Sequence, residues 1–265
     1  MITEVIPQTE YRGKKEYLSA SDIKLILENP YLYKIGYQRE SSDSMILGSV
    51  IHSLVLEPEN FDRDFEVIEP VNIRTKAGKD IMNKHKAESG KIIVPLPFYE
   101  KAKKVANSVL SSDIGNLFKN GVAEHSYFGE LYGVKCKCRP DYVLEASSKK
   151  VIVDLKTTKF GGASPDAFMR SIASYGYYIQ AAFYLNLLQA DDFIFVAVET
   201  DAPFMIGVYE LDRVSLDFGE SEIKRAIEIY QNLDKIDCVY KDSDFKKKQT
   251  LTLPNWVYYK KDSKI

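Results

Sequence analysis

Two acidic residues and a lysine stand close together in the stretch from Cys136 to Thr158, which reads CKCRPDYVLEASSKKVIVDLKTT. Asp141 follows a proline, and Asp154-Leu155-Lys156 comes after twelve further residues. Hard carboxylate oxygens are ligands that suit Mg²⁺ and Mn²⁺, and these ions often share their ligands with a phosphate. A neighbouring ammonium could position an attacking water or neutralise charge that develops in a transition state. The spacing therefore indicates a metal site that acts on a phosphate.

Two short strands are predicted to position these residues. Val151 to Lys156 is a β-branched run that follows a polar turn, and side chains alternate along a strand, so Asp154 and Lys156 share one face. An acid and a lysine buried together must pair or hold a cation, because burial of an unpaired charge is costly. Asp141 opens the preceding run, and the turn between them returns the chain to an adjacent position. The alternative is a solvated hairpin with a surface salt bridge.

Two further polar positions lie on predicted helices. Gln180 and Tyr184 are four residues apart in the run YYIQAAFY, so their polar ends share one helix face. His52 lies in the apolar run LGSVIHSL, whose small residues permit close packing. The alternatives are an amphipathic helix with a tyrosine at the edge of the core, and a hydrogen-bonded core histidine.

As a set, these residues resemble the PD-(D/E)xK nuclease superfamily. Pro140-Asp141 is similar to the PD, and Asp154-Leu155-Lys156 is similar to the DxK. The glutamine and tyrosine look like the QxxxY element of the RecB-like and lambda-exonuclease-like branches. The string GSVIHSLVLEPENF is similar to the GSALHxLLLEP segment of RecE-type exonucleases. The resemblance runs from about Leu18 to Tyr184, and the motifs follow the chain order of that branch.

This resemblance implies an α/β fold, with a restriction-endonuclease-like core in which a central mixed sheet is flanked by helices, plus helical N-terminal elements. It implies Mg²⁺ as cofactor, and Mn²⁺ as a substitute because one ligand is a histidine. The implied metal ligands are His52, Asp141, Asp154 and the carbonyl of Leu155. The other implied site residues are Lys156, which positions water, Gln180 and Tyr184, which contact DNA or brace the site, and Glu124, an additional acid before the PD.

The activity implied by the resemblance is a Mg²⁺-dependent 5′→3′ exonuclease on double-stranded DNA ends, which leaves 3′ single-stranded tails for a single-strand-annealing recombinase. A ring-shaped homo-oligomer is also implied, a tetramer as in the RecE type rather than the trimer of the lambda type. Strand polarity and ring size do not follow from the residues themselves. Two alternatives stay open: a structure-specific endonuclease of the same superfamily, and a catalytically silent DNA-binding scaffold.

Several positions are candidates for DNA contact. Ser19 or Ser21 caps a helix that begins in LSASD, and a helix start favours an anion. The resemblance implies a serine that holds a 5′ phosphate here, although the arginine expected beside it is not evident. Lys137 and Arg139 alternate with cysteines along a strand, and Thr157 lies in the exit from the DxK strand. The other basic positions belong either to a phosphate-binding patch and tail or to solvated faces: Arg74, Lys76, Lys79, Lys84, Lys86, Lys246, Lys247, Lys248, Lys260 and Lys261.

Composition sets limits on the class of protein. The 265 residues include 36 Lys and Arg against 38 Asp and Glu, so any DNA contact must come from local patches. We expect one globular nuclease domain over residues 1–265, no membrane insertion and a cytoplasmic location. The three cysteines, Cys136, Cys138 and Cys238, are too few for a four-cysteine cluster and are predicted to be packing residues.

The remaining pattern predicts further elements. Strands are expected over 65–70, 124–132, 134–139, 193–199 and 204–211, and helices over 74–88, 97–110, 164–175 and 214–234.

Overall fold

The computed structural model describes residues 1–38, 42–71, 75–146, 149–239, 248 and 250–255. Its centre is a five-stranded mixed sheet in which β8 and β9 run parallel and the other neighbours are antiparallel. This confirms the predicted α/β class. In sheet order, the strands are β10 (Ile206–Tyr209), β9 (Asp192–Glu199), β8 (Lys149–Thr158), β7 (Tyr142–Ala146) and β4 (Gly121–Ala123).

Strand β8 is buried on both faces, as its β-branched run predicts. Ile152 packs into one hydrophobic core, and Val153 and Leu155 pack into a second core on the opposite side of the sheet. The alternation of side chains along β8 therefore divides the apolar residues between two layers. Within the run Val151 to Lys156, the charged side chains are those of Asp154 and Lys156.

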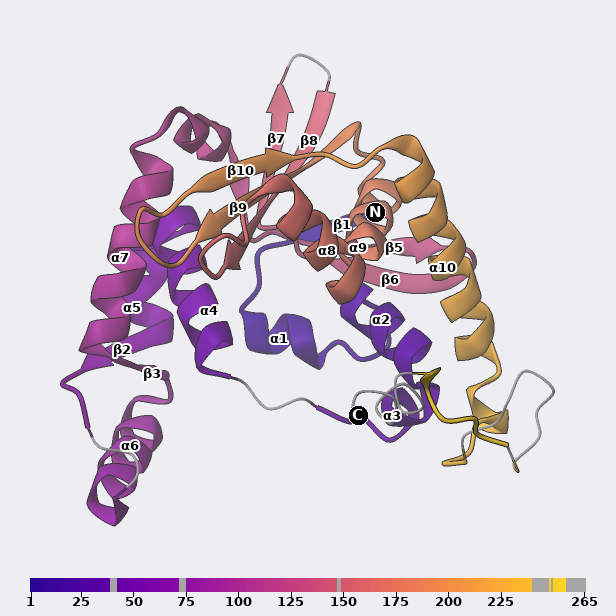
Figure 1. Ribbon diagram of the computed structural model, residues 1–265, viewed down its shortest axis with the longest axis horizontal. Coiled ribbons are helices and arrows are strands. Elements are labelled where there is room, and N and C mark those ends of the chain that lie inside the picture. Colours follow the sequence, from indigo (N-terminus) through magenta and orange to yellow (C-terminus); the bar gives the residue numbers. More distant parts are fainter. Residues whose placement is uncertain (39–41, 72–74, 147–148, 240–247, 249, 256–265) are drawn as a thin grey trace, which may run out of the picture.

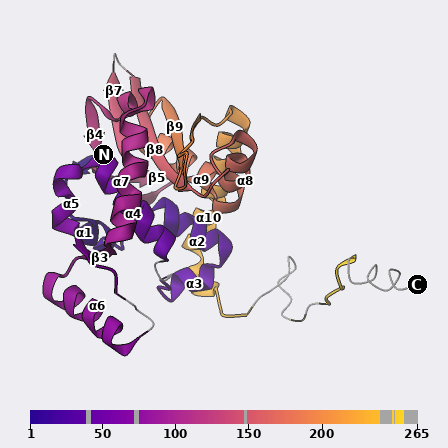
Figure 2. The ribbon, with the colours of Figure 1, turned by 60° about the vertical axis from the view of Figure 1, so that its left-hand side comes forward.

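Helices cover both faces of the sheet (Figures 1 and 2). The first core is shared with α2 (Ala20–Glu28), α8 (Pro165–Tyr175), α9 (Tyr177–Leu188) and α10 (Arg213–Gln231), and the second with α4 (Asp43–Leu56) and α7 (Leu96–Leu110). The pair α8 and α9 forms the crossover that parallel strands β8 and β9 require. The central sheet is thus flanked by helices, as predicted.

A smaller antiparallel sheet lies beside the first core. It consists of β1 (Ile2–Glu4), β5 (Ser126–Leu131) and β6 (Val134–Cys138) in the order β1-β5-β6. The β5–β6 turn has positive φ at Tyr132 and Gly133, which matches the twist of a two-residue hairpin. The turn therefore lies between the two strands that were predicted over 124–132 and 134–139.

A third sheet forms a projecting unit. Strands β2 (Phe65–Ile68) and β3 (Ile92–Pro95) pair in parallel, and α6 (Lys76–Ser89) connects them. Helix α6 lies apart from the central sheet, at the bottom of both views (Figures 1 and 2). The remaining helical segments are α1 (Gln8–Gly13), α3 (Pro30–Lys34), α5 (Phe61–Asp64) and three 3-10 turns, at Pro58–Asn60, Asp113–Phe118 and Leu233–Lys235.

Some predicted boundaries were wrong for local reasons. The strand expected over 124–132 begins at Ser126, because Glu124 has a φ of 52° and interrupts the extended chain. The strand expected over 204–211 is shorter, because Phe204 has a φ of 61°. Cys136 and Cys138 are buried as predicted, but Cys238 is exposed and is not a packing residue. Among the described residues, no helix has the length and apolarity needed to cross a membrane.

Candidate active site

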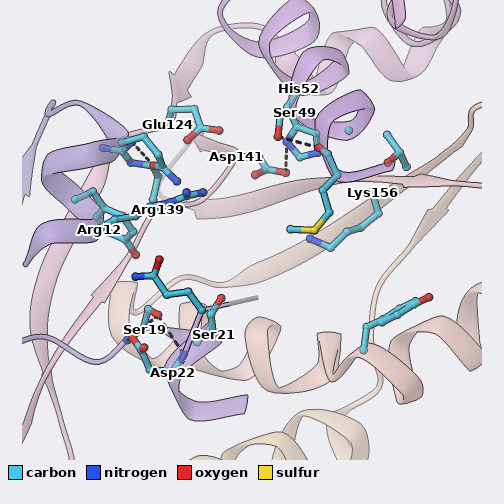
Figure 3. A pocket seen from close by; sticks show the side chains of 18 of the residues that line it. Arg12, Ser19, Ser21, Asp22, Ser49, His52, Glu124, Arg139, Asp141 and Lys156 are labelled. Atoms are coloured by element: carbon cyan, nitrogen blue, oxygen red, sulfur yellow. Dashed lines mark hydrogen bonds and ion pairs between the residues drawn. The ribbon is translucent and has the colours of Figure 1, made fainter. Parts of the chain in front are cut away.

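A large open groove, about 2450 Å³ in volume, runs between the N-terminal helices and the ends of β7 and β8. Side chains from α4, from the segment before β5, from β8 and from α9 line it. Figure 3 shows the part of this groove that contains His52, Glu124, Asp141 and Lys156. The residues that sequence analysis selected from distant segments are therefore brought together.

Asp141 lies where the β7–β8 ladder ends. The last cross-strand pair is Tyr142 with Val153. The next β8 residue directed to that edge is Leu155, and its N–H donates to Oδ2 of Asp141 at 2.7 Å. A carboxylate thus replaces the missing ladder partner, which fixes the orientation of Asp141.

Helix α4 positions His52 beside the carboxylate of Asp141. Nδ1 of His52 lies 3.4 Å from Oδ2 of Asp141. The helix packs closely on β8 because Gly48 has no side chain: a Cβ there would lie 3.3 Å from Oγ1 of Thr157. The small residue one turn before the histidine therefore has the packing role that the sequence indicated.

Glu124 completes a group of three metal-ligand side chains, the one such group found among the described residues. Ligand atoms of His52, Glu124 and Asp141 all lie within 4.8 Å of one another. The left-handed backbone of Glu124, with a φ of 52°, turns the chain between β4 and β5, and its N–H donates to the Asp141 carbonyl at 3.2 Å. One imidazole and two carboxylates form a donor set that fits a divalent cation such as Mn²⁺ or Mg²⁺.

Asp154 and Lys156 form the second part of the site. Asp154 is 1% exposed, and its Oδ1 accepts a hydrogen bond of 2.7 Å from Nε2 of Gln180. Its Oδ2 pairs with the ammonium of Lys156. Asp154 lies outside the three-residue group described above. Asp154 was predicted to be a metal ligand, but in this structure its two oxygens contact Lys156 and Gln180.

The electrostatics of the site raise the pKa of two candidate metal ligands, Glu124 and His52, and so favour their protonated forms. Burial, helped by the charge of Asp141, raises the pKa of Glu124 to about 8. Burial alone would lower the pKa of His52, but the Asp141 carboxylate outweighs it and raises that pKa. The pKa of Lys156 is likewise raised, because Asp154 and Asp141 outweigh its burial. Without a metal, protons on these groups offset the buried acids.

Tyr184, Lys137 and Arg139 line the groove, but their polar atoms bond to backbone carbonyls of the protein itself. The hydroxyl of Tyr184 donates to the Arg139 carbonyl at 3.3 Å, which steadies the segment that leads to Asp141. Lys137 is 4% exposed, and its ammonium donates to the carbonyls of Tyr11 and Lys14 at 2.8 and 2.7 Å.

The guanidinium of Arg139 donates to the carbonyl of Ile6 and to Ser126. Lys137 and Arg139 therefore fasten the N-terminal segment around α1 to β6. This role differs from the predicted contact with a DNA backbone.

The other candidates for DNA contact are distributed along the groove and outside it. Ser19 is the residue that caps α2: its Oγ accepts from Asp22 N–H at 3.3 Å, and its own N–H donates to the Asp22 carboxylate. Ser21 and Thr157 also line the groove. Lys76, Lys79 and Lys84 are exposed on α6. Arg74, Lys246, Lys247, Lys260, Lys261 and the side chain of Lys86 lie outside the described residues.

Tyr177 is an aromatic residue of the site that was not predicted from the sequence. Its ring centroid lies 4.8 Å from Nζ of Lys156. The available signal was its spacing, because a residue three positions before Gln180 shares the same helix face.

The family of the chain follows from its sequence and agrees with this geometry. A profile of the PDDEXK-like domain of unknown function (DUF3799) matches residues 28–239, and the chain belongs to that family. Together with the mixed sheet and the acids at the end of β7 and on β8, this makes the protein a nuclease of the PD-(D/E)xK class. No curated protein has a sequence that matches the chain.

Solved structures resemble the chain at low sequence identity. A candidate exonuclease from Eubacterium rectale has a TM-score of 0.62 at 15% identity, over 99% of this chain and 100% of that one. A phage-related exonuclease from Haemophilus somnus 129PT scores 0.37 at 15% identity, over 83% and 95%. An alkaline exonuclease from Laribacter hongkongensis scores 0.32 at 10% identity, over 86% and 95%. The first likeness supports the fold, and the other two are too distant to add to it.

Proposed function

We propose that the protein is a divalent-metal-dependent exonuclease that hydrolyses phosphodiesters at the ends of double-stranded DNA. The observation that carries this proposal is the group of His52, Glu124 and Asp141, which lies in the same open groove as the ammonium of Lys156. A cation and a lysine on opposite sides of one phosphate could both neutralise its charge.

In this proposal His52, Glu124 and Asp141 hold the cation, Mg²⁺ or Mn²⁺. The carbonyl of Leu155 is a fourth candidate, because the N–H and C=O of a strand residue point to the same edge. Continuation of the β7–β8 register would place Leu155 opposite Pro140, which has no N–H to donate to that carbonyl. The proline of the PD pair thereby leaves an oxygen available beside Asp141.

The side chains of the site have different roles in the proposed hydrolysis. A bound divalent cation would polarise the scissile phosphate and lower the pKa of a bound water. Lys156 is held protonated by Asp154, so its ammonium can orient the attacking water and stabilise developing negative charge. Gln180 fixes Asp154, and Tyr184 fixes the backbone before Asp141. These two residues position the catalytic groups.

Action at DNA ends is supported by the RecE-like motifs and by the likeness to the candidate exonuclease from Eubacterium rectale. The same resemblance supports 5′→3′ polarity, 3′ tails for a single-strand-annealing recombinase and a ring-shaped homo-oligomer, with a tetramer favoured over a trimer. A structure-specific endonuclease and a silent DNA-binding scaffold are the alternatives. The lysine buried against Asp154 argues against the scaffold, since binding alone does not require this costly pair.

Digestion of linear duplex DNA, labelled separately at the 5′ and 3′ ends, tests the proposal. The reactions contain Mg²⁺, Mn²⁺ or EDTA, and covalently closed circles serve as the matched substrate without ends. We expect metal-dependent release of labelled nucleotides from the 5′ ends and no cleavage of circles. Release from 3′ ends would reverse the polarity, equal cleavage of circles would favour the endonuclease, and no cleavage with either metal would favour the scaffold.

A further inference from the structure

Two tyrosines lead from the catalytic lysine toward solvent. The ring of Tyr177 lies 4.8 Å from Nζ of Lys156, and the ring centroids of Tyr177 and Tyr175 are 5.6 Å apart at an interplanar angle of 32°. Both residues line the groove. Tyr177 is half-buried, whereas Tyr175 is 63% exposed. The two aromatic rings therefore extend from the ammonium of Lys156 to the solvent-exposed ring of Tyr175.

The turn that carries these rings is held in place. Gly176 separates α8 from α9 with a φ of 62°, a conformation that favours glycine. Lys24 of α2 donates to the Tyr175 carbonyl at 3.4 Å, and its ammonium lies 5.9 Å from the Tyr177 ring. A Cβ at Gly176 would lie 3.0 Å from Cδ of Lys24. The two rings are thus presented by a packed turn, which reduces the entropy lost when a ligand binds.

Core packing does not account for the position of Tyr175, because most of its side chain stays in water. An exposed aromatic face beside a phosphate-binding site suits a nucleobase, since every base can stack on an aromatic ring regardless of sequence. Polar side chains on the same helix, Arg170, Ser171 and Ser174, also line the groove. They are placed to contact the sugar–phosphate backbone of a strand whose base lies on the ring.

We propose that Tyr175 is a stacking platform for one unpaired nucleobase, that of a nucleotide next to the phosphate at Lys156. This inference rests on the proposed function and adds a base subsite to it. A base inside a duplex has both faces covered by its neighbours, so it reaches Tyr175 only from a frayed end or a single strand. The platform would therefore favour strand ends over continuous duplex without reading sequence.

DNA binding in EDTA tests this subsite separately from cleavage. The probe is a fluorescein-labelled linear duplex, and anisotropy gives its Kd for the wild type, Tyr175→Phe and Tyr175→Leu. We expect the leucine variant to raise Kd about tenfold and the phenylalanine variant to leave it unchanged, because only the ring is required. Phe218→Leu is the control, since Phe218 is 55% exposed on α10 and is not part of the groove lining. Thermal unfolding verifies that each variant is folded.

A scan of abasic tetrahydrofuran nucleotides through the probe identifies the base. At one position, the missing base should weaken wild-type binding about tenfold and leave Tyr175→Leu binding unchanged, because the ring and the base form one interaction. Unchanged Kd in Tyr175→Leu, or abasic penalties that are equal in both proteins at every position, would overturn the subsite.

Cleavage of the same probe with Mg²⁺ or Mn²⁺ is measured in parallel. If the wild type shows metal-dependent cleavage, and neither DNA binding nor cleavage changes in the Tyr175 variants, the nuclease proposal stands and the stacking platform is removed. Tyr175-dependent binding without any cleavage retains the platform and removes the nuclease. Absence of DNA binding by the wild type in EDTA removes the platform, and absence of cleavage as well removes both.

Discussion

Asp141 connects the parts of the site at the scale of single residues. Its Oδ2 accepts from the N–H of Leu155 at 2.7 Å and lies 3.4 Å from Nδ1 of His52. Its charge also raises the pKa of Glu124, after the larger effect of burial. A change at this residue therefore affects the strand edge, the histidine and the second acid together.

The ion pair of Asp154 and Lys156 should stabilise the fold as well as serve catalysis. We expect Lys156→Met to abolish cleavage and to lower the free energy of unfolding by about 3–5 kcal/mol, because it leaves a buried carboxylate unpaired. Asp154→Asn combined with Lys156→Met should recover most of that stability but no activity. Denaturant unfolding in EDTA measures both effects. Lys149→Met is the control, since Lys149 lies on the same strand but is exposed. Equal stability of wild type and Lys156→Met would contradict the pairing.

The raised pKa of Glu124 predicts a pH-dependent stability in the metal-free protein. Its pKa rises from 4.5 to about 8 on folding, so the protonated form is favoured in the folded state. Stability from this group is complete below pH 4.5 and is lost as the pH rises through 8, at no more than about 1.4 kcal/mol per pH unit. Glu124→Gln should therefore be more stable than wild type at pH 9, with the difference vanishing near pH 4. A constant difference across this range would show that the pKa of Glu124 is not raised in the folded protein.

Metal binding should release protons, because His52 and Glu124 must deprotonate to become ligands. Both have a raised pKa in the metal-free protein. Calorimetric titration with Mn²⁺ at pH 7, in two buffers of different ionisation enthalpy, counts the protons released. We expect at least one proton per ion, and an affinity that increases from pH 6 to pH 8. Release that is the same in His52→Ala and Glu124→Gln as in wild type would place the ion elsewhere.

At the scale of elements, the close packing of α4 on β8 sets the position of His52. Gly48→Val should push the helix away from Thr157, since even a Cβ would lie 3.3 Å from its Oγ1. We expect Mn²⁺ affinity to fall about tenfold, which corresponds to about 1.4 kcal/mol. Ser44→Val, at an exposed position of the same helix, should leave the affinity unchanged. Equal affinity in the two variants would show that the helix spacing does not matter.

Local patterns predicted most of the elements and the motif residues within them. The β-branched run of β8 is a strand as predicted, α7 matches the helix predicted over 97–110 to within one residue, and α2 is capped by Ser19, one of the two serines predicted for that role. Each of these signals is a property of neighbouring residues.

The contacts that were missed join distant segments. Lys137 donates to carbonyls at Tyr11 and Lys14, more than a hundred positions away in the chain. An alternating strand pattern gives no sign of such a partner, and it therefore predicted an outward-facing cation. The sequence pattern likewise assigned no role to Tyr177, and the fold places its ring against Lys156.

At the scale of the whole molecule, the groove would allow a nearly neutral protein to bind DNA, as proposed above. The chain carries 36 basic and 38 acidic residues, so its net charge gives no general attraction. Arg12, Lys15, Lys34, Lys159 and Arg170 nevertheless all line the groove. Local positive charge at the groove can steer a phosphate backbone toward acids that a divalent cation neutralises.

The most direct test of the account compares Mn²⁺-dependent cleavage of linear duplex DNA by wild type, Asp141→Asn and Glu145→Gln. Glu145 is the matched control, because it is an exposed acid on β7, the strand that Asp141 precedes. We expect wild type and Glu145→Gln to cleave at similar rates that rise to saturation with Mn²⁺, and Asp141→Asn to lose at least 100-fold in rate, a typical cost of one removed electrostatic group. Undiminished cleavage by Asp141→Asn would show that the group of His52, Glu124 and Asp141 is not the metal centre of this nuclease.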